Sequence, residues 1–420
     1  MEPRSIPIAA GPLAARIGAI PSKSVTHRAL VAAALSRGVS EIVDPLDATD
    51  TRVTAAGLVA LGFDVRALTD RWLVTGGAGE VPGGGTLDLG ESGTSLRLLL
   101  ALAALGAKPA HLDGAPRLRE RPAAELATAL VELGARIEGP RPGQLPLRAG
   151  GRVFGGGTVR LPGGRSSQFA SALLLAGTAL DGGLLLHVEP PAVSRPYIAL
   201  TAEVMRAFDL RVDPEAALTW RVARGAGCAR TYRVEGDHSS ASYFLVAAAV
   251  VGGSVTVAGL RADSLQPDAR LASLLADLDC RVEVGGDAVT VHAGGRIPGF
   301  EVDLADTPDL GPSVAVLALF ADGPSRIGGV AHLRLKESDR LDLLARNLRA
   351  LGRDARATAD SLVVGGVSRP RGAVIQTAGD HRMAMAFAVA GLRQPGIVID
   401  DPACVAKSNP SFWEQVDSLR

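Results

Sequence analysis

Cysteine and aromatic residues are scarce in this chain of 420 residues. The three cysteines, Cys228, Cys280 and Cys404, lie far apart, so they form neither the spacing of a metal site nor a disulfide framework. Such usage is typical of a protein in the reducing cytoplasm. Aromatic residues make up only 4% of the chain, and sugar-binding platforms usually use aromatic rings. This scarcity disfavours a non-catalytic carbohydrate-binding repeat protein.

An excess of charge and a long apolar run are also absent. The 44 lysines and arginines balance 44 acidic residues, so nothing indicates a surface for nucleic acid or for a membrane. No apolar run reaches the 18 or so residues of a transmembrane helix. The first 21 residues contain charges and prolines and lack the apolar centre of a signal peptide. We therefore expect a cytoplasmic protein.

What the chain does contain is a pattern that recurs about every 70 residues. A short polar cluster is followed by an apolar run of helix length, six times in all, beginning at Ser22, Glu91, Ser166, Ser239, Pro312 and Asp380. A fixed period indicates repeated supersecondary units. The runs are too apolar all round for surface helices, so we expect them to be buried. Their polar starts, several with a cation, are typical of helix N-termini that bind anions.

Strands and amphipathic helices are predicted between the buried helices. Alternating valines around Gly285 and Gly286 predict a hairpin. Amphipathic helices are predicted from Thr51, Ala123, Ala269 and Ser338, and the last has Leu341, Leu344, Leu348 and Leu351 on one face. Six such units divide naturally into two domains of three.

Ten segments together resemble a known family. In chain order they are PSKSVTHRAL, GESGTSLR, RLRERP, SSQFASALL, SRPYI, VEGDHSSASYF, the DTPDLGP region, LKESDR, GDHRMAMAF and CVAKSNPSFWEQ, from Pro21 to Gln415. The set resembles the EPSP synthases, the 3-phosphoshikimate 1-carboxyvinyltransferases of the enolpyruvate transferase family. One departure is the first segment, where the family normally has a glycine after the proline.

The resemblance implies an α/β (α+β) fold of two similar domains with a cleft between them. Each domain would hold three βαβαββ repeats around buried parallel helices, an inside-out α/β barrel. Domain I would comprise residues 1–16 and 235–420 and carry acids and cations on the phosphoenolpyruvate side. Domain II would comprise residues 17–234 and form the shikimate 3-phosphate side.

The resemblance also implies a reaction. The enolpyruvyl group of phosphoenolpyruvate is transferred to the 5-hydroxyl of shikimate 3-phosphate, which gives 5-enolpyruvylshikimate 3-phosphate and phosphate in aromatic amino acid biosynthesis. The family uses neither a metal nor an organic cofactor. We expect a monomer that closes on its substrates, with glyphosate as a competitor of phosphoenolpyruvate.

Site residues in the first half carry over by resemblance. Shikimate 3-phosphate would be held by Lys23, Ser24, Arg28, Ser166, Ser167, Gln168, Ser194 and Tyr197. Phosphoenolpyruvate would meet Lys23, Gly93, Arg121 and Gln168. Arg117 and Arg119 are interpreted as solvated, and the roles of Glu91 and Arg97 stay open, Arg97 being equally well a structural pairing residue.

In the second half, Lys336 and Arg340 are four residues apart and predicted on one helical face. By resemblance Asp309, His332 and Lys336 meet shikimate 3-phosphate, and Arg340, Arg382 and Lys407 meet phosphoenolpyruvate. The catalytic residues would be Asp309, Glu337 and Lys23. We expect Glu337 to deliver and remove the methyl proton, and Asp309 to accept the hydroxyl proton, with Lys23 sharing it. The roles of His332 and His381 stay open.

Other functions are weighed against this one. The sister transferase that acts on UDP-N-acetylglucosamine generally has a reactive cysteine in the region that matches Arg117–Arg121, and none lies there. RNA 3′-phosphate cyclase has related units but would need a basic surface. An assay of phosphate release from phosphoenolpyruvate separates these functions. Only an EPSP synthase is expected to release phosphate in a way that depends on shikimate 3-phosphate, and neither the two other enzymes nor a sugar-binding protein would do so.

Overall fold

The computed structural model of the protein describes residues 2–151, 155–366 and 370–420. The chain divides into two compact units. Unit 1 comprises Met1–Ile20 and Glu235–Arg420, and unit 2 comprises Pro21–Val234. The sequence placed the first crossing near Arg16, but the strand that contains Arg16, β2 (Leu13–Gly18), pairs along its whole length with β16 (Gly253–Ala258). This pairing keeps the residues after Arg16 in unit 1, so the first crossing lies four residues further on.

Unit 2 is built from seven described helices and thirteen described strands. The helices are α1 Lys23–Leu35, α2 Thr49–Ala60, α3 Gly93–Leu105, α4 Pro116–Glu120, α5 Ala124–Glu132, α6 Ser167–Gly177 and α7 Pro196–Ala207. The strands are β3 Ser36–Val43, β4 Asp64–Ala67, β5 Arg71–Gly77, β6 Thr86–Asp88, β7 Ala110–Asp113, β8 Ile137–Glu138, β9 Leu147–Ala149, β10 Gly157–Pro162, β11 Leu184–Glu189, β12 Val212–Ala216, β13 Thr219–Val222, β14 Gly227–Cys228 and β15 Thr231–Arg233.

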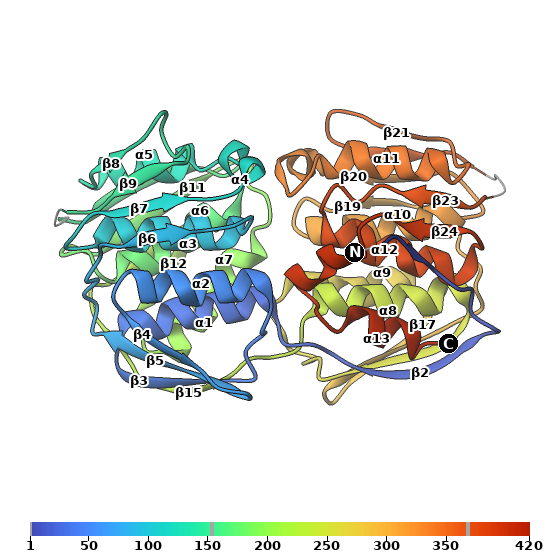
Figure 1. Ribbon diagram of the computed structural model, residues 1–420, viewed down its shortest axis with the longest axis horizontal. Helices are drawn as coiled ribbons and strands as arrows, with labels where there is room; N and C mark the ends of the chain where they lie inside the picture. Colours follow the sequence, from blue (N-terminus) through green and yellow to red (C-terminus); the bar gives the residue numbers. More distant parts are fainter. Residues whose placement is uncertain (1, 152–154, 367–369) are drawn as a thin grey trace. The chain divides into compact units, whose positions relative to one another are not determined.

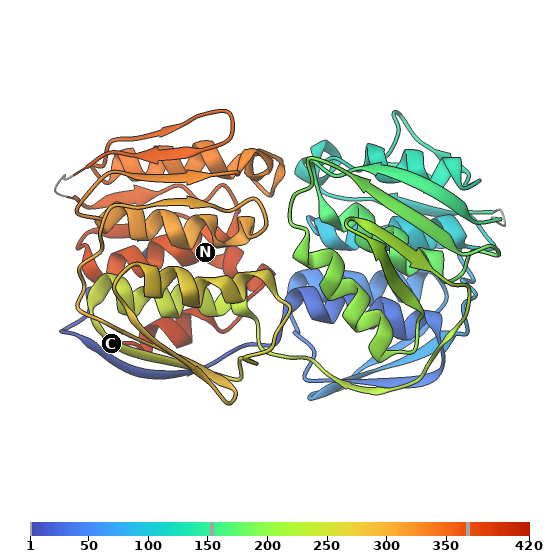
Figure 2. The ribbon, with the colours of Figure 1, turned by 180° about the vertical axis from the view of Figure 1, so that it is seen from behind.

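The strands of unit 2 form three sheets of one pattern. Two sheets have the orders β6-β7-β9-β8 and β10-β11-β13-β12, and the third has the order β14-β3-β5-β4 with β15 also beside β3. In each sheet a parallel pair is extended by antiparallel strands. The parallel pairs β6–β7 and β10–β11 are joined through α3 and α6, as parallel strands require a crossover. Figure 1 shows α1, α3 and α6 inside the unit, and α7, clear in Figure 2, packs against α1 and α6.

Unit 1 repeats this plan. Its helices, 3₁₀ segments included, are α8 His238–Val251, η1 Pro267–Arg270, α9 Leu271–Asp277, η2 Pro308–Leu310, α10 Gly311–Phe320, η3 Ala331–Leu335, α11 Arg340–Ala350, α12 His381–Arg393, η4 Pro402–Lys407 and α13 Phe412–Asp417. Its strands, besides β2 and β16, are β1 Arg4–Ser5, β17 Arg281–Gly285, β18 Ala288–Ala293, β19 Glu301–Asp303, β20 Ser325–Gly328, β21 Ala355–Ala357, β22 Leu362–Val364, β23 Ala373–Ile375 and β24 Ile397–Ile399. The sheet orders are β17-β18-β16-β2, β19-β20-β22-β21 and β1-β24-β23.

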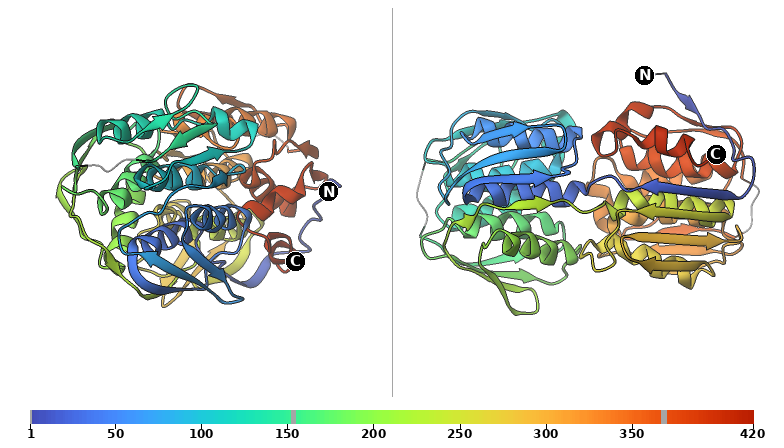
Figure 3. Two further views of the ribbon diagram at one scale, coloured as in Figure 1. Left: turned by 60° about the vertical axis from the view of Figure 1, so that its left-hand side comes forward. Right: turned by 90° about the horizontal axis from the view of Figure 1, so that it is seen from below.

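Before each crossing, the last strand pairs within the unit that the chain is about to leave. β2 precedes α1 of unit 2 in sequence, yet it pairs in parallel with β16 of unit 1, as Figure 3 shows. β15 precedes α8 of unit 1, yet it pairs in parallel with β3 of unit 2. The first sheet of each unit is therefore completed by the segment that leads into the other unit.

The six predicted apolar helices are present and buried, as α1, α3, α6, α8, α10 and α12. In α10 the run from Gly311 to Leu319 is buried on every side, which explains why its sequence shows no polar face. The predicted leucine face of α11 is also confirmed, because Leu341, Leu344, Leu348 and Leu351 are all buried. Within the described part of the chain, no helix combines the length and the apolar character that crossing a membrane requires.

Candidate active site

In unit 2 the predicted site residues gather where α1, α3 and α6 begin. The three helices are capped by Ser22, Ser92 and Ser166, whose hydroxyl oxygens each accept a hydrogen bond from a backbone N–H of the first turn. Helix N-termini carry a partial positive charge and leave N–H groups without helical partners. This end of unit 2 therefore suits an anionic ligand.

Arg28 is a buried cation one turn into α1. Its Nε donates to Thr201 Oγ1 at 2.8 Å, and its terminal nitrogens donate to the carbonyl oxygens of Ser24 and Tyr197 and to Ser171 Oγ, at 2.8 to 3.5 Å. Its guanidinium carbon also lies 5.7 Å from the centre of the Tyr197 ring. Every described hydrogen-bond partner is thus a neutral oxygen. Burial lowers the pKa of Arg28 to about 10, so the group stays charged at neutral pH.

Lys23, the first residue of α1, is held by a residue that sequence reasoning missed. Its Nζ lies 3.1 Å from Asp50 Oδ2, near the start of α2, and both side chains are largely buried. A partly buried ion pair of this kind fixes a flexible lysine in one place. The only sequence signal for Asp50 was its position just before a predicted amphipathic helix.

Gln168 and Arg97 connect α6 with α3. Gln168 Nε2 donates to Thr94 Oγ1 at 3.0 Å, and Arg97 donates to Gln168 Oε1 at 3.3 Å. Arg97 also donates to the carbonyl oxygens of Gly93 and Pro122, at 2.8 and 2.7 Å. Of the two roles that the sequence left open for Arg97, these contacts favour the structural one.

Arg121 lies against the first residue of α3. Its terminal nitrogen donates to the Glu91 carbonyl oxygen at 3.4 Å, and its side chain is almost fully buried. A Cβ atom built on Gly93 would collide with the guanidinium groups of both Arg97 and Arg121. Glycine at position 93 is therefore what allows two cations to approach the start of α3. Arg117 and Arg119 instead make exposed ion pairs, as predicted.

The remaining predicted residues of unit 2 lie at the starts of α1, α6 and α7. Ser24 and Ser167 lie in the first turns of α1 and α6. Ser194, with a left-handed φ of 54°, precedes α7, and its carbonyl oxygen accepts the N–H of Tyr197. Since α7 packs on both α1 and α6, Tyr197 belongs to the same cluster as Arg28.

Unit 1 has a different cluster, centred on Arg340, which is 1% exposed. Its three guanidinium nitrogens contact three carboxylates, those of Asp380 at 2.8 Å, Glu337 at 2.6 Å and Asp309 at 3.2 Å. Burial alone would lower the pKa of Arg340, but the three carboxylates raise it well above its usual range. The predicted residues Asp309, Glu337 and Arg340 therefore form one network.

Asp309 is the centre of a second layer of this network. Arg382 donates to its Oδ2 at 2.8 Å, and Lys336 Nζ lies 3.7 Å from its Oδ1. Burial would raise the pKa of Asp309, but Arg382, Lys336 and Arg340 together hold it well below its usual range. Asp309 is thus a carboxylate at neutral pH, able to accept a proton or a hydrogen bond.

The predicted helical turn through Lys336 and Arg340 is wrong. Asp339 caps α11 by accepting the N–H of Asp342, so the helix begins only at Arg340. Lys336 follows η3 in an extended conformation. The two cations converge because both contact Asp309, and not because they share a helical face.

Three further predicted residues of unit 1 are buried close by. His332 is 4% exposed, and burial, with Lys336 next in weight, lowers its pKa to about 3, so it is neutral. His381 is wholly buried, with Nδ1 3.9 Å from Asp380 Oδ1. Lys407 ends η4, which packs against α12, the helix that carries Arg382.

Sequence reasoning missed two buried acids of unit 1, Asp380, which contacts Arg340, and Asp268. Asp380 caps α12 by accepting a hydrogen bond from the backbone N–H of Arg382, and it accepts a second hydrogen bond from the hydroxyl of Ser338. Its one sequence signal was its place just before a buried helix. Asp268 is also buried and is contacted by the Ser239 hydroxyl. In the described ranges no three His, Cys, Asp or Glu side chains are grouped to hold a metal ion.

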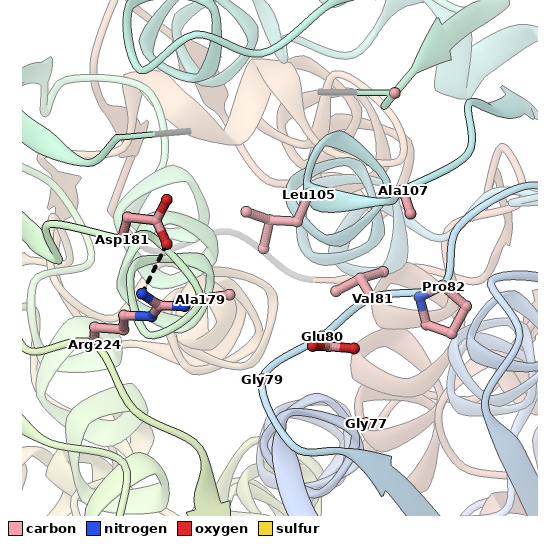
Figure 4. Close-up of a pocket in the computed structure, with 11 residues that line it drawn as sticks. Gly77, Gly79, Glu80, Val81, Pro82, Leu105, Ala107, Ala179, Asp181 and Arg224 are labelled. Carbon is pink, nitrogen blue, oxygen red and sulfur yellow. Dashed lines mark ion pairs between the residues drawn. The ribbon is translucent and has the colours of Figure 1, made fainter. Parts of the chain in front are cut away.

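A cavity of unit 2 lies away from these residues. It has a volume of about 660 Å³ and is lined by the turn from Gly77 to Pro82 and by residues at the C-terminal ends of α3 and α6. Figure 4 shows its polar groups, Glu80 and the Asp181–Arg224 pair, around an apolar floor that includes Leu105. None of the predicted site residues lines it, so the candidate active site is the pair of clusters and not this cavity.

Comparison with known proteins gives the family. The family model described as EPSP synthase (3-phosphoshikimate 1-carboxyvinyltransferase) matches residues 8–416. The chain belongs to the EPSP synthase family. The 3-phosphoshikimate 1-carboxyvinyltransferase of Methanoculleus marisnigri is 44% identical over 409 residues, covering 96% of both chains. That of Syntrophobacter fumaroxidans is 44% identical over 406 residues, covering 95% of both.

A solved structure agrees with this family. EPSP synthase from Acinetobacter baumannii superposes with a TM-score of 0.80 at 25% identity, over 100% of this chain and 98% of that one. The predicted mixed α/β fold is therefore confirmed, as are the predicted family and its activity, that of a 3-phosphoshikimate 1-carboxyvinyltransferase of the shikimate pathway.

Proposed function

We propose that this chain carries out the EPSP synthase reaction with the residues of the two clusters. It transfers the enolpyruvyl group of phosphoenolpyruvate to the 5-hydroxyl of shikimate 3-phosphate and releases phosphate. The observation that carries the proposal is Arg28, a buried charged guanidinium at a helix start whose described hydrogen-bond partners are all neutral oxygens. Such a cation retains its charge for an anionic ligand.

The substrates set the electrostatic requirement. Each carries one phosphate and one carboxylate, roughly six negative charges in total near neutral pH. Lysine and arginine bind such groups through short, charge-assisted hydrogen bonds. In this proposal the unit 2 cluster binds shikimate 3-phosphate through Ser24, Arg28, Ser166, Ser167, Gln168, Ser194 and Tyr197. From unit 1, His332 and Lys336 contact the same substrate.

Phosphoenolpyruvate is bound by cations of both clusters, Arg121 of unit 2 and Arg340, Arg382 and Lys407 of unit 1. Gly93 leaves room beside Arg121, and Gln168 and Lys23 contact both substrates. This assignment requires that the two units bring their clusters to one pair of substrates. The cleft and the three-repeat plan of each domain are parts of the proposal.

The chemistry follows from the acids of unit 1. Glu337 delivers a proton to C3 of phosphoenolpyruvate while the 5-hydroxyl oxygen attacks C2, which gives a tetrahedral ketal. Asp309 accepts the hydroxyl proton, and Lys23 shares it. Glu337 then removes a proton from the new methyl group as the bond from C2 to the phosphate oxygen breaks, which restores the double bond. The leaving phosphate takes up the hydroxyl proton held by Asp309 and Lys23, so these residues return to their starting state. One group thus acts first as acid and then as base.

The substitution Glu337→Gln tests this assignment. The amide cannot exchange a proton with the methyl group, so we expect turnover to fall by about two to four orders of magnitude. Methyl hydrogen exchange in deuterated water should fall in parallel, measured by NMR. Glu301→Gln, which breaks an exposed ion pair with Arg326, is the control and should leave turnover unchanged. Near-normal exchange and turnover in Glu337→Gln would refute the role of Glu337.

Ligand-induced closure is the second test. Cations of the two units repel one another until the substrates neutralise them, so we expect the radius of gyration to fall when shikimate 3-phosphate is added. Small-angle X-ray scattering measures this change directly. A radius that stays constant at saturating ligand contradicts closure.

Other parts of the assignment are checked by simpler assays. Phosphate release from phosphoenolpyruvate should require shikimate 3-phosphate and should not occur with UDP-N-acetylglucosamine. Glyphosate should compete with phosphoenolpyruvate. We further infer that the protein is a monomer and that it is located in the cytoplasm. Its three free cysteines support the cytoplasmic location.

A further inference from the structure

His27 is a buried, titratable residue of unit 2 that the proposed mechanism does not use. It lies on α1, one turn after Lys23, and is 0% exposed. Its Nδ1 lies 2.7 Å from Thr54 Oγ1 on α2, and Thr54 Oγ1 lies 2.7 Å from Ser95 Oγ on α3. One chain of hydrogen bonds thus joins α2 to α1 and α3, two of the helices whose first turns form the unit 2 cluster.

The direction of this chain follows from its last member. Ser95 Oγ donates to the backbone oxygen of Asp50 at 3.2 Å, and a carbonyl oxygen can only accept. The single hydroxyl hydrogen of Ser95 is thereby used, so Ser92 and Thr54 must both donate to Ser95 Oγ. With its own hydrogen used, Thr54 must accept from His27. His27 is therefore the tautomer with hydrogen on Nδ1.

We propose that neutral His27 is a positioning residue for Lys23. Its hydrogen bond to Thr54 fixes the chain that ends on the backbone of Asp50, and the Asp50 carboxylate in turn holds Lys23 Nζ at 3.1 Å. The same chain passes through Ser92 and Ser95, which flank Gly93 at the start of α3. The inference rests on the proposed function, because it assigns His27 to the placement of a lysine that contacts both substrates.

The surroundings of His27 keep it in this neutral form. Burial, opposed by Asp50 and aided by Lys23 and Arg28, lowers the pKa of His27 to about 3. Its Nε2 is buried and has no hydrogen-bond partner among the residues that the structure describes. Protonation would place an N–H without an acceptor in the core, beside two cations. The imidazole therefore acts as a fixed donor at Nδ1 throughout the neutral pH range.

The chain offers a test with a matched control. His27→Asn keeps an N–H donor near the position of Nδ1, whereas His27→Leu removes it at similar volume. A second pair, Thr54→Ser and Thr54→Val, keeps or removes the hydroxyl. The control is His187→Leu, which removes a bond of the same kind, from Nδ1 to Thr219 Oγ1 at 3.0 Å, in a sheet of the same unit.

We expect kcat/KM per folded molecule to fall about tenfold in His27→Leu and in Thr54→Val, the scale of one buried hydrogen bond lost. KM for both substrates should rise, while His27→Asn and Thr54→Ser stay near the wild type. A merely structural role would lower the melting temperature without changing KM, which is what we expect of His187→Leu. Unchanged KM in His27→Leu, or an Asn variant no better than Leu, would overturn the inference.

NMR of the wild-type protein tests the same inference without a substitution that could prevent folding. With ¹⁵N-labelled histidine, His27 should show a protonated Nδ1 and a bare Nε2 from about pH 5 to pH 8, without titration. The opposite tautomer, or titration near the ordinary histidine pKa, refutes the inference. Failure of the proposed function is separate, because then the wild type itself lacks activity with shikimate 3-phosphate.

Discussion

Two buried arginines, Arg28 in unit 2 and Arg340 in unit 1, have opposite surroundings. Arg28 donates to hydroxyl and carbonyl oxygens, and its pKa is lowered. Arg340 contacts three carboxylates, and its pKa is raised. Both side chains are almost wholly buried and both belong to a cluster of predicted site residues.

The difference separates two ways of preparing a site for anions. Neutral partners orient Arg28 without cancelling its charge, so the cluster retains an attraction for an incoming phosphate. Carboxylate partners cancel the charge of Arg340 but bring acids and cations together, which proton transfer requires. Unit 2 is thus suited to binding, and unit 1 to binding combined with acid–base chemistry.

The largest expected effect comes from removing each arginine. Arg340→Met leaves the buried Asp380 and the partly buried Asp309 and Glu337 without their common cation, which should lower the free energy of unfolding by about 3–5 kcal/mol. Arg28→Met leaves only neutral acceptors and should cost about 1–3 kcal/mol, while affinity for shikimate 3-phosphate falls more strongly.

Urea denaturation of the two variants measures this difference. Trp413 reports unit 1, and Trp72 and Trp220 report unit 2, when the other tryptophans are replaced by phenylalanine. Arg119→Ala, which breaks an exposed ion pair with Asp113, sets the baseline and should cost less than about 1 kcal/mol. Equal losses in Arg28→Met and Arg340→Met would erase the distinction between the clusters.

A pH-dependent effect should follow from Asp268, a buried acid of unit 1 without a described ion pair. Burial, followed by the nearby Asp309, raises the pKa of Asp268 to about 7 against the opposing effect of Arg382. Folding therefore takes up a proton between about pH 4 and pH 7, so this group contributes stability at low pH that is lost as pH rises through 7.

Asp268→Asn removes that dependence. Relative to the wild type, the variant should gain about 2 kcal/mol of unfolding free energy between pH 5 and pH 8. Denaturant midpoints at the two pH values give this difference, with exposed Asp277→Asn as the matched substitution. A stability difference that is independent of pH would show that Asp268 is ionised like its neighbours.

The smallest expected effect is confined to unit 2. Gly93→Ala would place a methyl group against the guanidinium groups of Arg97 and Arg121. Their displacement should raise KM for phosphoenolpyruvate about tenfold, equivalent to the loss of one hydrogen bond to a charged group. Steady-state kinetics test this, with Gly285→Ala, which meets no atom within 4 Å, as the control. An unchanged KM would mean that Arg121 does not bind this substrate.

The sequence was sufficient for the helices and for the cations. The six runs are apolar on every side, which predicts burial, and each forms a buried helix in the structure. Arg28 and Arg382 stand in motifs that open two of those helices, and Arg340 begins the amphipathic helix α11, while their site roles were predicted from the resemblance. Local sequence also predicted the hairpin of β17 and β18 around Gly285 and Gly286.

The partners of the cations were not predictable in the same way. Asp50 lies 27 residues from Lys23, and Asp380 lies 40 residues from Arg340, so only the packing of separate helices brings them together. The course of the chain at Lys336 was predicted wrongly because the competing cap, Asp339, was overlooked. Charge pairing between helices is a property of the tertiary structure, and helix periodicity carries no information about it.

The pairing of β1 and β2 with strands from the second half of the chain has a consequence for biosynthesis. Unit 2 is one continuous stretch, whereas unit 1 needs β1 and β2 from the beginning of the chain to pair with strands made more than 200 residues later. On the ribosome the middle of the protein can reach its native state early. The unpaired leading strands must meanwhile avoid aggregation until β16 and β24 emerge from the ribosome. Mutations that raise the aggregation tendency of residues 4–18 should therefore lower the yield of soluble protein from cells more than they lower the stability of the folded protein.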